Sequence, residues 1–215
     1  MRKSPRQERA RITMEAILEA GTEVFAGRGY ARTNTNEIAR RAGISVGSLY
    51  QYFPSKDAIL MALLERHLRA VEATIRGCLP DLANDRVPLR RAVRRLLGRL
   101  VAVHEANPAL SRAVEQPAGE MPKIPEAYRL YLETFVSELE SLLRRRRDVR
   151  RADPALMAHL LYAAAEALTG WLAHGPSGRF ERSAALRESV ELLCRYVERP
   201  ASGSLASKAR GSRAS

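Results

Sequence analysis

Residues 33–57, TNTNEIARRAGISVGSLYQYFPSKD, constrain the fold of this chain more than any other segment. They contain two short helical patterns joined at Gly43, a residue that adopts the left-handed conformation at the end of a helix without steric cost. Two short helices joined by a tight turn are typical of a helix-turn-helix, which places its second helix in the major groove of DNA. The segment therefore predicts a DNA-binding unit.

Capping residues set the expected limits of these helices. Thr35 is expected to be the N-cap of the first short helix, and Ser45 the N-cap of the second, which should run from Val46 to Phe53. Leu49 and Phe53 are four residues apart on the second helix, so both should face inward. The remaining faces of that helix carry small, polar and aromatic residues.

The order and spacing of these residues resemble the DNA-binding region of the TetR family of transcriptional regulators. The matching positions are Thr35, Ile38, Ala39, Ala42, Gly43, Ser45, Gly47, Leu49, Tyr50, Tyr52, Phe53, Ser55 and Lys56. An upstream set, Ile17, Leu18, Ala20, Phe25, Gly29, Tyr30 and Thr33, is similar to the first helix and turn of that family. The resemblance covers roughly residues 10–65.

Composition favours an all-α fold. Alanine and leucine are abundant, aromatic residues make up 6%, and no segment alternates like a half-buried strand. The resemblance implies a three-helix DNA-binding domain followed by a larger helical ligand-binding and dimerisation domain. We therefore expect about nine helices and three regions: residues 1–55, residues 56–199, and a disordered basic tail at 200–215.

Helix limits outside the motif follow from glycine and proline. The first helix should end near Ala26, before Gly27 and Gly29. A long helix should begin at Lys56 and stop at Gly77 and Pro80, with a connector from 80 to 87. Further helices are expected to begin at Pro88, after Asn107-Pro108, before Tyr128, after Asp153-Pro154 and near Glu181, the last of them ending near Glu198.

The expected DNA contacts divide into phosphate and base contacts. The resemblance implies phosphate contacts by Thr35, Tyr50, Tyr52 and Lys56. Base edges are then left to the other residues near the recognition helix, and glutamine can pair with adenine while valine can touch a thymine methyl. The candidates for base contact are Asn36, Ser45, Val46, Gly47, Ser48 and Gln51, and Ser45 could instead be only a helix cap.

Charge agrees with a nucleic-acid partner but does not locate it. The net charge is +12, yet residues 1–56 contribute only +5. The basic arm at residues 1–9, with Arg2, Lys3, Arg6 and Arg9, could follow phosphate, enter the minor groove or simply be solvated. The arginines at 144–147, 150 and 151 are more typical of a solvated helix end than of an anion site.

Residues 155–174 are long and apolar enough to raise the question of a membrane span. Glu166, His159 and His174 would be costly in hydrocarbon, so we expect a buried helix of a soluble protein and no membrane contact. The small residues of this helix would let another helix approach closely. The resemblance implies a homodimer formed by this helix and residues 183–198, which would set two recognition helices on one palindromic double-stranded DNA operator.

The resemblance implies that the second domain binds a small-molecule effector in a pocket walled by the fourth to eighth helices of the chain, and that a filled pocket shifts the fourth helix. Candidate pocket residues are His67, His104, Tyr128, Tyr131, Phe135, Tyr162, Glu166 and Trp171, most of which could equally be plain core. Glu166 could lie at the subunit interface, pair with an arginine or bind a cationic ligand.

No motif indicates catalysis, a metal site or a cofactor, and Cys78 and Cys194 are too few for a disulfide framework. The sequence therefore predicts a cytoplasmic, non-enzymatic DNA-binding regulator, most simply a repressor released by a largely apolar ligand. Two alternatives remain: a regulator of the same fold controlled by a protein partner or by no ligand, and an enzyme that carries an incidental helix-turn-helix.

Overall fold

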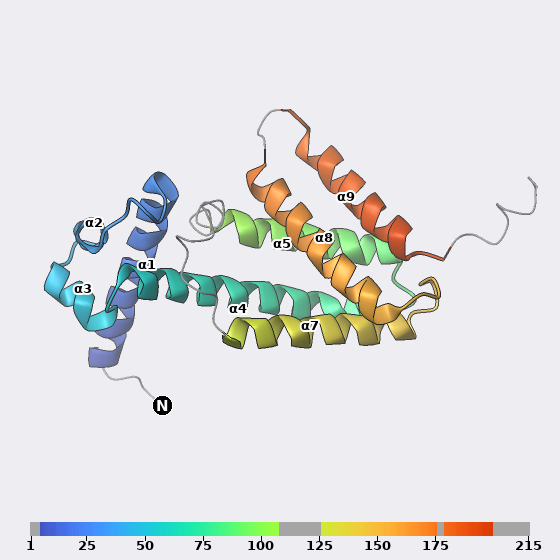
Figure 1. The fold of residues 1–215 in the computed structure, drawn as a ribbon, viewed down its shortest axis with the longest axis horizontal. Helices are drawn as coiled ribbons and strands as arrows, with labels where there is room; N and C mark the ends of the chain where they lie inside the picture. Colours follow the sequence, from blue (N-terminus) through green and yellow to red (C-terminus); the bar gives the residue numbers. More distant parts are fainter. Residues whose placement is uncertain (1–4, 108–125, 176–178, 200–215) are drawn as a thin grey trace, which may run out of the picture.

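The computed structural model describes residues 5–107, 126–175 and 179–199, and these residues form eight α-helices (Figure 1). Side chains of residues 126–132 are not described. The helices are α1 (Pro5–Arg28), α2 (Thr35–Arg41), α3 (Val46–Tyr52), α4 (Lys56–Ala83), α5 (Leu89–Glu105), α7 (Glu126–Arg145), α8 (Pro154–His174) and α9 (Arg182–Val197). The expected all-α fold is confirmed, and the short helix expected after Pro108 lies outside the described residues.

Helices α1, α2 and α3 form a small head that packs on the first turns of α4 (Figure 1). Its core contains the fully buried Ile17, Phe25, Ile38 and Leu49. A Cβ atom at Gly21 would lie 2.9 Å from Cγ2 of Ile59 on α4, so α1 and α4 cross at a distance that only glycine allows. The head is therefore held firmly on the end of α4.

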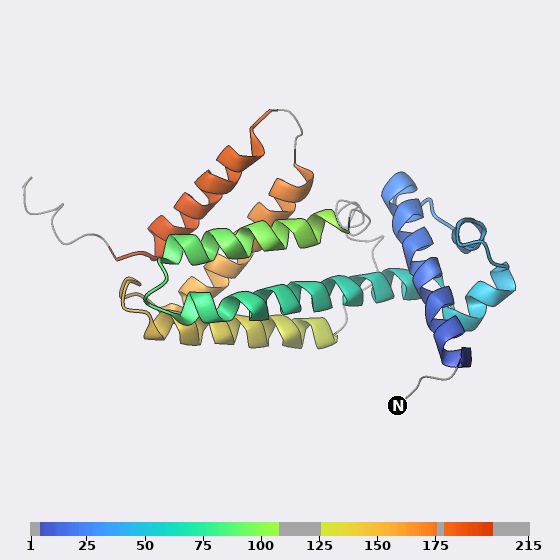
Figure 2. The same ribbon diagram turned by 180° about the vertical axis from the view of Figure 1, so that it is seen from behind.

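The other helices form a larger body along α4, as both ribbon views show (Figures 1 and 2). Helix α5 packs on α4 and α8, and α7 packs on α8. Helix α9 covers α5 and α8 on the outer side. Helix α4 leaves the head and runs the length of this body, so it is the continuous connection between the two parts.

Helix α4 does not stop at Gly77 and Pro80 as predicted; it continues to Ala83. Proline removes one backbone hydrogen bond and is normally costly inside a helix. Here the last turn is held from outside, because the buried guanidinium of Arg146 donates to the carbonyl oxygens of Leu82 at 2.8 Å and Val87 at 3.2 Å. The connector is accordingly shorter than predicted and begins at Asn84.

Two predictions at the start of the motif are also wrong in detail. Helix α1 continues through Gly27 to Arg28, and Gly29, with φ of 78°, ends it. The N-cap of α2 is Asn34, whose side chain accepts from the backbone N–H of Glu37 at 3.0 Å, and Thr35 is the first helical residue. Asparagine caps helices at least as well as threonine, and Asn34 directly precedes Thr35, so the sequence alone does not decide which of the two is the cap.

The other caps are confirmed. Ser45 accepts from the N–H of Ser48 at 3.0 Å, Ser55 from that of Ala58 at 3.1 Å, and Asp153 from that of Ala155 at 2.9 Å. Gly43 has a φ of 71° between α2 and α3, the left-handed conformation expected of it. The predicted turn of the helix-turn-helix is therefore present.

Helix α8 is less buried than predicted. By length and composition it could span a membrane, but it carries Glu166 and two histidines, and only a small part of its apolar stretch is buried in this chain. Its exposed side carries Leu156, Leu160 and Trp171. The reason is that α8 packs on α5, α7 and α9 with one side only, which leaves an apolar outer surface.

Candidate DNA-binding surface and effector cavity

The recognition helix α3 presents a mostly polar surface to solvent. Leu49 is fully buried beneath it and Phe53 is 5% exposed, so these two hold α3 on the head as expected. Ser45, Gly47 and Gln51 are exposed. Asn36 is exposed on the neighbouring α2. Asn36, Gly47 and Gln51 are therefore free to meet the edges of bases, whereas the hydroxyl of Ser45 already accepts from the N–H of Ser48 as the cap of α3.

Val46, Ser48 and Tyr52 are more restricted. Val46 and Tyr52 are half-buried and pack against the core of the head. The hydroxyl of Ser48 lies 2.8 Å from that of Ser45. Val46 and Tyr52 therefore pack part of their apolar surface within the head, and the Ser48 hydroxyl is bonded to that of Ser45. Only the exposed part of each side chain could contact DNA.

The structure brings together two of the predicted phosphate contacts. The hydroxyl oxygens of Thr35 and Tyr50 lie 3.0 Å apart, although the residues are 15 positions apart in sequence. Tyr50 is 50% exposed, so the pair is open to solvent. One of the two hydroxyls donates to the other, and the O–H that remains can donate to a phosphate oxygen, which is the kind of contact that fixes a protein on the DNA backbone.

Lys56 is placed differently from what the motif implied. Its Nζ donates to the carbonyl oxygens of Tyr30, Ala31 and Thr33 at 3.1, 3.3 and 3.2 Å, and it lies 4.4 Å from the centre of the Tyr30 ring. An ammonium group has three donors, and all three are directed into the turn between α1 and α2. Lys56 therefore shapes this turn, and a phosphate contact stays a prediction.

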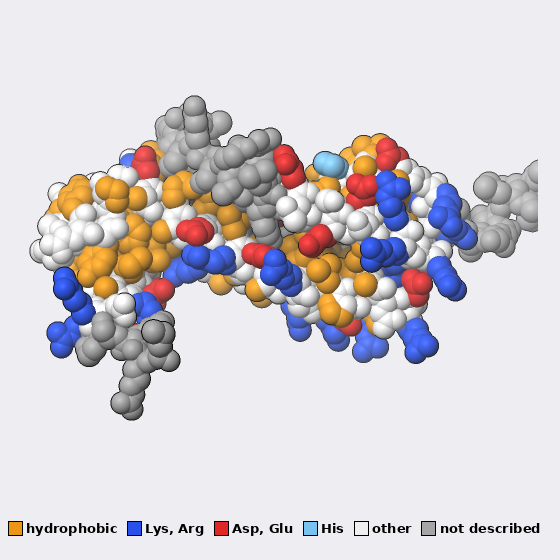
Figure 3. All heavy atoms as spheres, turned by 90° about the horizontal axis from the view of Figure 1, so that it is seen from below, with side chains coloured by type: hydrophobic (Ala, Val, Ile, Leu, Met, Phe, Trp, Pro, Cys, Tyr) orange, Lys and Arg blue, Asp and Glu red, His pale blue; other side chains and the backbone are white. Residues whose placement is uncertain are grey.

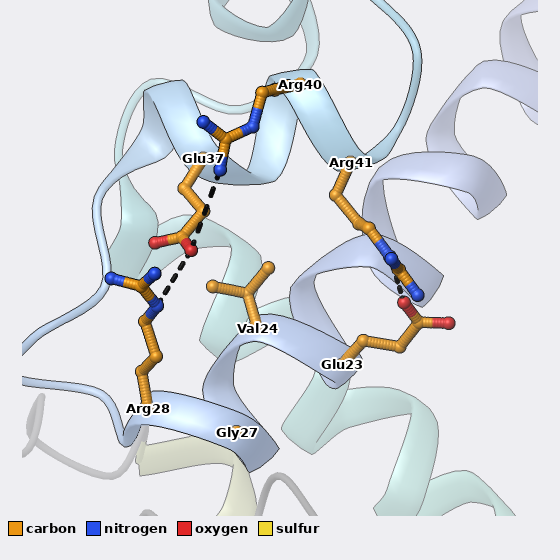
Figure 4. Close-up of a pocket in the computed structure, with 7 residues that line it drawn as sticks. All are labelled: Glu23, Val24, Gly27, Arg28, Glu37, Arg40 and Arg41. Atoms are coloured by element: carbon orange, nitrogen blue, oxygen red, sulfur yellow. Dashed lines mark hydrogen bonds and ion pairs between the residues drawn. The ribbon is translucent and has the colours of Figure 1, made fainter.

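A polar groove of about 630 Å³ lies between α1 and α2 (Figure 4). Arg28 pairs with Glu37 at 2.8 Å, and Arg41 pairs with Glu23 across the two helices. Figure 4 shows these side chains bridging the groove above Val24 and Gly27. Three arginines and two glutamates line the groove, and both glutamates are paired with arginines, so these ion pairs hold α2 on α1 and leave little for an effector to bind.

A smaller and much more apolar cavity lies in the body. It has a volume of about 110 Å³ and is enclosed by α4, α5, α7, α8 and α9. Helix α4 contributes Val71, Ile75 and Leu79 to its wall. Engineered apolar cavities of roughly 150 Å³ take up benzene, so this one is in the range for a small hydrocarbon group. A molecule bound here would touch the helix that carries the head.

Three of the eight predicted pocket residues line this cavity: Phe135, Tyr162 and Glu166. The rings of Phe135 and Tyr162 meet edge to face with centroids 6.0 Å apart. The side chains of Tyr128 and Tyr131 lie outside the described residues. Most of the wall is leucine and valine, which sequence alone could not separate from ordinary core.

The other three predicted pocket residues lie elsewhere. Trp171 is 40% exposed and packs on Phe180 at 6.1 Å. His67 on α4 and His104 on α5 are buried, with ring centroids 5.0 Å apart, and neither lines the cavity. His174 completes the group, because its Nε2 lies 3.1 Å from the carbonyl oxygen of His104.

Burial affects the protonation of this histidine group. The loss of solvation, and then the nearby His104 and His174, lower the pKa of His67 to about 4. Burial lowers the pKa of His104 as well. The Nδ1 atom of His67 is buried without a hydrogen-bond partner among the described residues. The rings of His67 and His104 are therefore neutral at neutral pH, at the place where α4 leaves the head and enters the body.

Basic side chains gather at the end of the body far from the head (Figure 3). Arg147 and Arg151 of the connection between α7 and α8 are exposed, whereas Arg146 is buried and paired with Asp148. The arginine set is therefore split: Arg146 is buried and Arg150 is half-buried and donates to the carbonyl oxygen of Tyr196 at 2.6 Å, whereas Arg144, Arg145, Arg147 and Arg151 are exposed as expected.

A helix-turn-helix head on a long helix that also walls an apolar cavity defines a class of protein, the DNA-binding regulator with a separate effector domain. The family described as "Bacterial regulatory proteins, tetR family" matches residues 17–63, and "Tetracyclin repressor-like, C-terminal domain" matches residues 88–196. The second match alone spans just over half of the chain. The chain belongs to the TetR family of transcriptional regulators.

Curated relatives agree. The "HTH-type transcriptional activator FasR" of Mycolicibacterium smegmatis is 40% identical over 89 residues, which are 41% of this chain and 39% of FasR. The "HTH-type transcriptional regulator EthR" of Mycobacterium tuberculosis is 25% identical over 150 residues, which are 69% of this chain and 68% of EthR. The aligned part thus spans less than half of FasR.

Solved structures share the whole fold. A TetR-like transcriptional regulator from Rhodococcus sp. RHA1 is 28% identical, with a TM-score of 0.61, and covers 86% of this chain and 94% of that one. The structure described as "SmeT-Triclosan complex" is 22% identical, with a TM-score of 0.63, and covers 88% of this chain and 93% of that one, a likeness of fold alone.

Proposed function

We propose that this protein is a homodimeric transcriptional repressor that binds a palindromic DNA operator and leaves it when a small, largely apolar molecule enters the body cavity. The observation that carries this proposal is the double role of α4. Its first turns pack in the head, and Val71, Ile75 and Leu79 of the same helix wall the cavity. A ligand that favours one position of α4 would therefore change the position of the head.

Two similar proteins support the proposal, because one is named as a repressor and the other was solved with a small molecule bound. The repressor KstR of Mycolicibacterium smegmatis is 32% identical over 108 residues, half of each chain. SmeT was solved with triclosan, a small molecule. FasR, in contrast, is described as an activator, which favours a second candidate in which this chain activates transcription from the same DNA-binding head.

For the DNA contacts, we propose that Thr35 and Tyr50 bind phosphate and that Gln51 reads a base. The hydroxyl pair and the exposure of Gln51 support this division. Asn36, Ser45 and Gly47 are the further exposed candidates for base contact. Val46 and Ser48 would contact bases, and Tyr52 phosphate, through the exposed parts of their side chains.

The test begins with selection of DNA sequences that the purified protein binds from a random pool. Gln51→Ala should relax preference at one base pair of each half-site by about 1–3 kcal/mol. Tyr50→Phe, the control, removes one hydroxyl and should weaken binding to all sequences alike. Equal loss at every base with Gln51→Ala would contradict the base-reading role. If the selection recovers no preferred sequence, the proposal that the protein binds a specific operator is contradicted.

A further inference from the structure

Glu166 differs from the other residues that wall the cavity, because it is the charged one among them. It lies on α8 four residues after Tyr162, so the two side chains project from the same side of that helix. Phe135 of α7 meets the Tyr162 ring edge to face. A carboxylate and two aromatic rings thus occupy one region of an otherwise aliphatic wall.

No cation of the described part of the chain pairs with this carboxylate. Elsewhere in the body, Glu105 pairs with Arg182 at 2.5 Å and Glu140 with Arg144 at 2.5 Å. The sequence has 36 lysines and arginines, so partners are not scarce. Thr169 donates to the backbone carbonyl oxygen of Glu166 at 3.2 Å, and no hydrogen bond from the described residues reaches the carboxylate. The arginine partner expected as one alternative is therefore missing among these residues.

The surroundings oppose the charge of Glu166. Glu166 belongs to the exposed residues of α8, yet the protein atoms around its carboxyl group raise the pKa of that group by desolvation. A carboxylate in apolar surroundings is unfavourable until an opposite charge joins it. A bound cation would supply that charge and would favour the ionised form.

We propose that the effector is a lipophilic cation: an amine or quaternary ammonium group on a hydrocarbon body, with the cation beside Glu166. The hydrocarbon would fill the aliphatic part of the cavity next to α4. The rings of Tyr162 and Phe135 would add cation–π attraction, which is stronger where water is excluded. This inference rests on the proposed function, because it names the ligand of the same cavity.

The same carboxylate would select against acids. A fatty acid or acyl carboxylate would bring a second negative charge beside Glu166, and neither charge would have a partner. A neutral alcohol of the same chain length would fill the cavity with neither electrostatic attraction to Glu166 nor repulsion from it. Three ligands that differ only in the head group therefore separate the contribution of charge from that of hydrocarbon.

The experiment measures binding of n-butylamine, n-butanol and butyrate to the full-length protein by isothermal titration calorimetry at pH 7.5. We expect the amine to bind about tenfold or more tightly than the alcohol, and butyrate to bind most weakly. Glu166→Gln should remove the preference for the amine and leave affinity for the alcohol unchanged. Glu138→Gln, which removes an exposed glutamate of α7 outside this cavity, should change neither.

Thermal unfolding and light scattering exclude trivial causes. Glu166→Gln removes a desolvated charge, so its melting temperature should equal or exceed that of the wild type, and its oligomeric state should be unchanged. A change of oligomeric state would overturn the proposal and place Glu166 in a subunit interface. Equal affinity for amine and alcohol, with DNA release by both, would overturn the cation while keeping the proposed function. Binding of none of the three would remove support from both.

Discussion

At the scale of single residues, Lys56 occupies a position of the DNA-binding motif but stabilises the fold of the head. Its ammonium group donates to three carbonyl oxygens between Tyr30 and Thr33. These bonds join the end of α1 to the start of α4, and so fix the turn that leads into α2.

Lys56→Met should therefore lower the stability of the head as well as its affinity for DNA. Three carbonyl oxygens lose a charged donor, and we expect a loss of roughly 1–3 kcal/mol in the free energy of unfolding. Chemical denaturation followed by circular dichroism measures this. A variant with unchanged stability and weaker binding to all DNA would show instead that Lys56 acts on phosphate alone.

His67 makes a prediction about pH. Its pKa is about 4 in the folded protein, against roughly 6.5 in an unfolded chain. Between these values the unfolded state binds more protons, so stability is full above pH ~6.5 and falls as the pH drops toward 4. His104 acts in the same direction, because burial also lowers its pKa.

The free energy of unfolding should therefore fall between pH 7.5 and pH 5 more steeply in the wild type than in His67→Phe, which keeps a ring without the titrating group. The loss of unfolding free energy due to His67, relative to neutral pH, reaches up to roughly 3 kcal/mol near pH 4. Urea unfolding at several pH values gives the slope for each protein. Parallel slopes would contradict a neutral buried His67.

At the scale of elements, the sequence predicted helices best where local caps decide them. Ser45, Ser55 and Asp153 each satisfy an N–H group two or three residues away, so their effect is readable in a short stretch. The end of α4 was not predictable in this way. It continues past Pro80 because Arg146, 64 positions after Leu82, binds the carbonyl of Leu82.

Arg146→Met should accordingly destabilise the body, whereas Arg147→Met should not. Arg146 is buried and bonded to Asp148, to the carbonyl oxygen of Leu82 in the last turn of α4 and to that of Val87 in the connection, and breaking such a set costs roughly 3 kcal/mol or more. The side chain of Arg147 is 93% exposed and 3.9 Å from Asp85, so its loss should stay within about 0.5 kcal/mol. Equal melting temperatures for the two variants would contradict the anchoring role of Arg146.

At the scale of the whole molecule, the apolar outer surface of α8 and α9 indicates where a second copy would bind. Leu160 on α8 and Leu192 on α9 are 48% and 59% exposed. Two-fold pairing here would place two heads on one DNA duplex, with recognition helices roughly 34–36 Å apart for adjacent major grooves.

Leu192→Arg should convert the dimer to a monomer and weaken operator binding, because one head alone contacts one half-site. Ala102→Asp, which adds a charge on the exposed side of α5, is the control and should leave both properties unchanged. Size-exclusion chromatography with light scattering gives the oligomeric state. A dimer that survives Leu192→Arg would place the interface elsewhere.

Prediction from sequence is weakest at this scale. The helix-turn-helix is predictable from sequence because its capping, glycine and aromatic positions lie within one short segment, and its DNA contacts stay a prediction. The cavity was foreseen only in Phe135, Tyr162 and Glu166, because aliphatic residues such as Ile75 have the same pattern in a cavity wall and in a filled core. His67 and His104 were assigned to the pocket, yet they pack on each other instead.

Coupling of the cavity to the DNA-binding head through α4 can be measured as a change in the dissociation constant of the wild-type protein for its selected operator. The constant is determined with and without a compound already shown by calorimetry to bind the cavity. Saturating compound should weaken operator binding by about tenfold or more. An operator affinity that stays unchanged while the cavity is fully occupied would show that α4 does not couple the two sites.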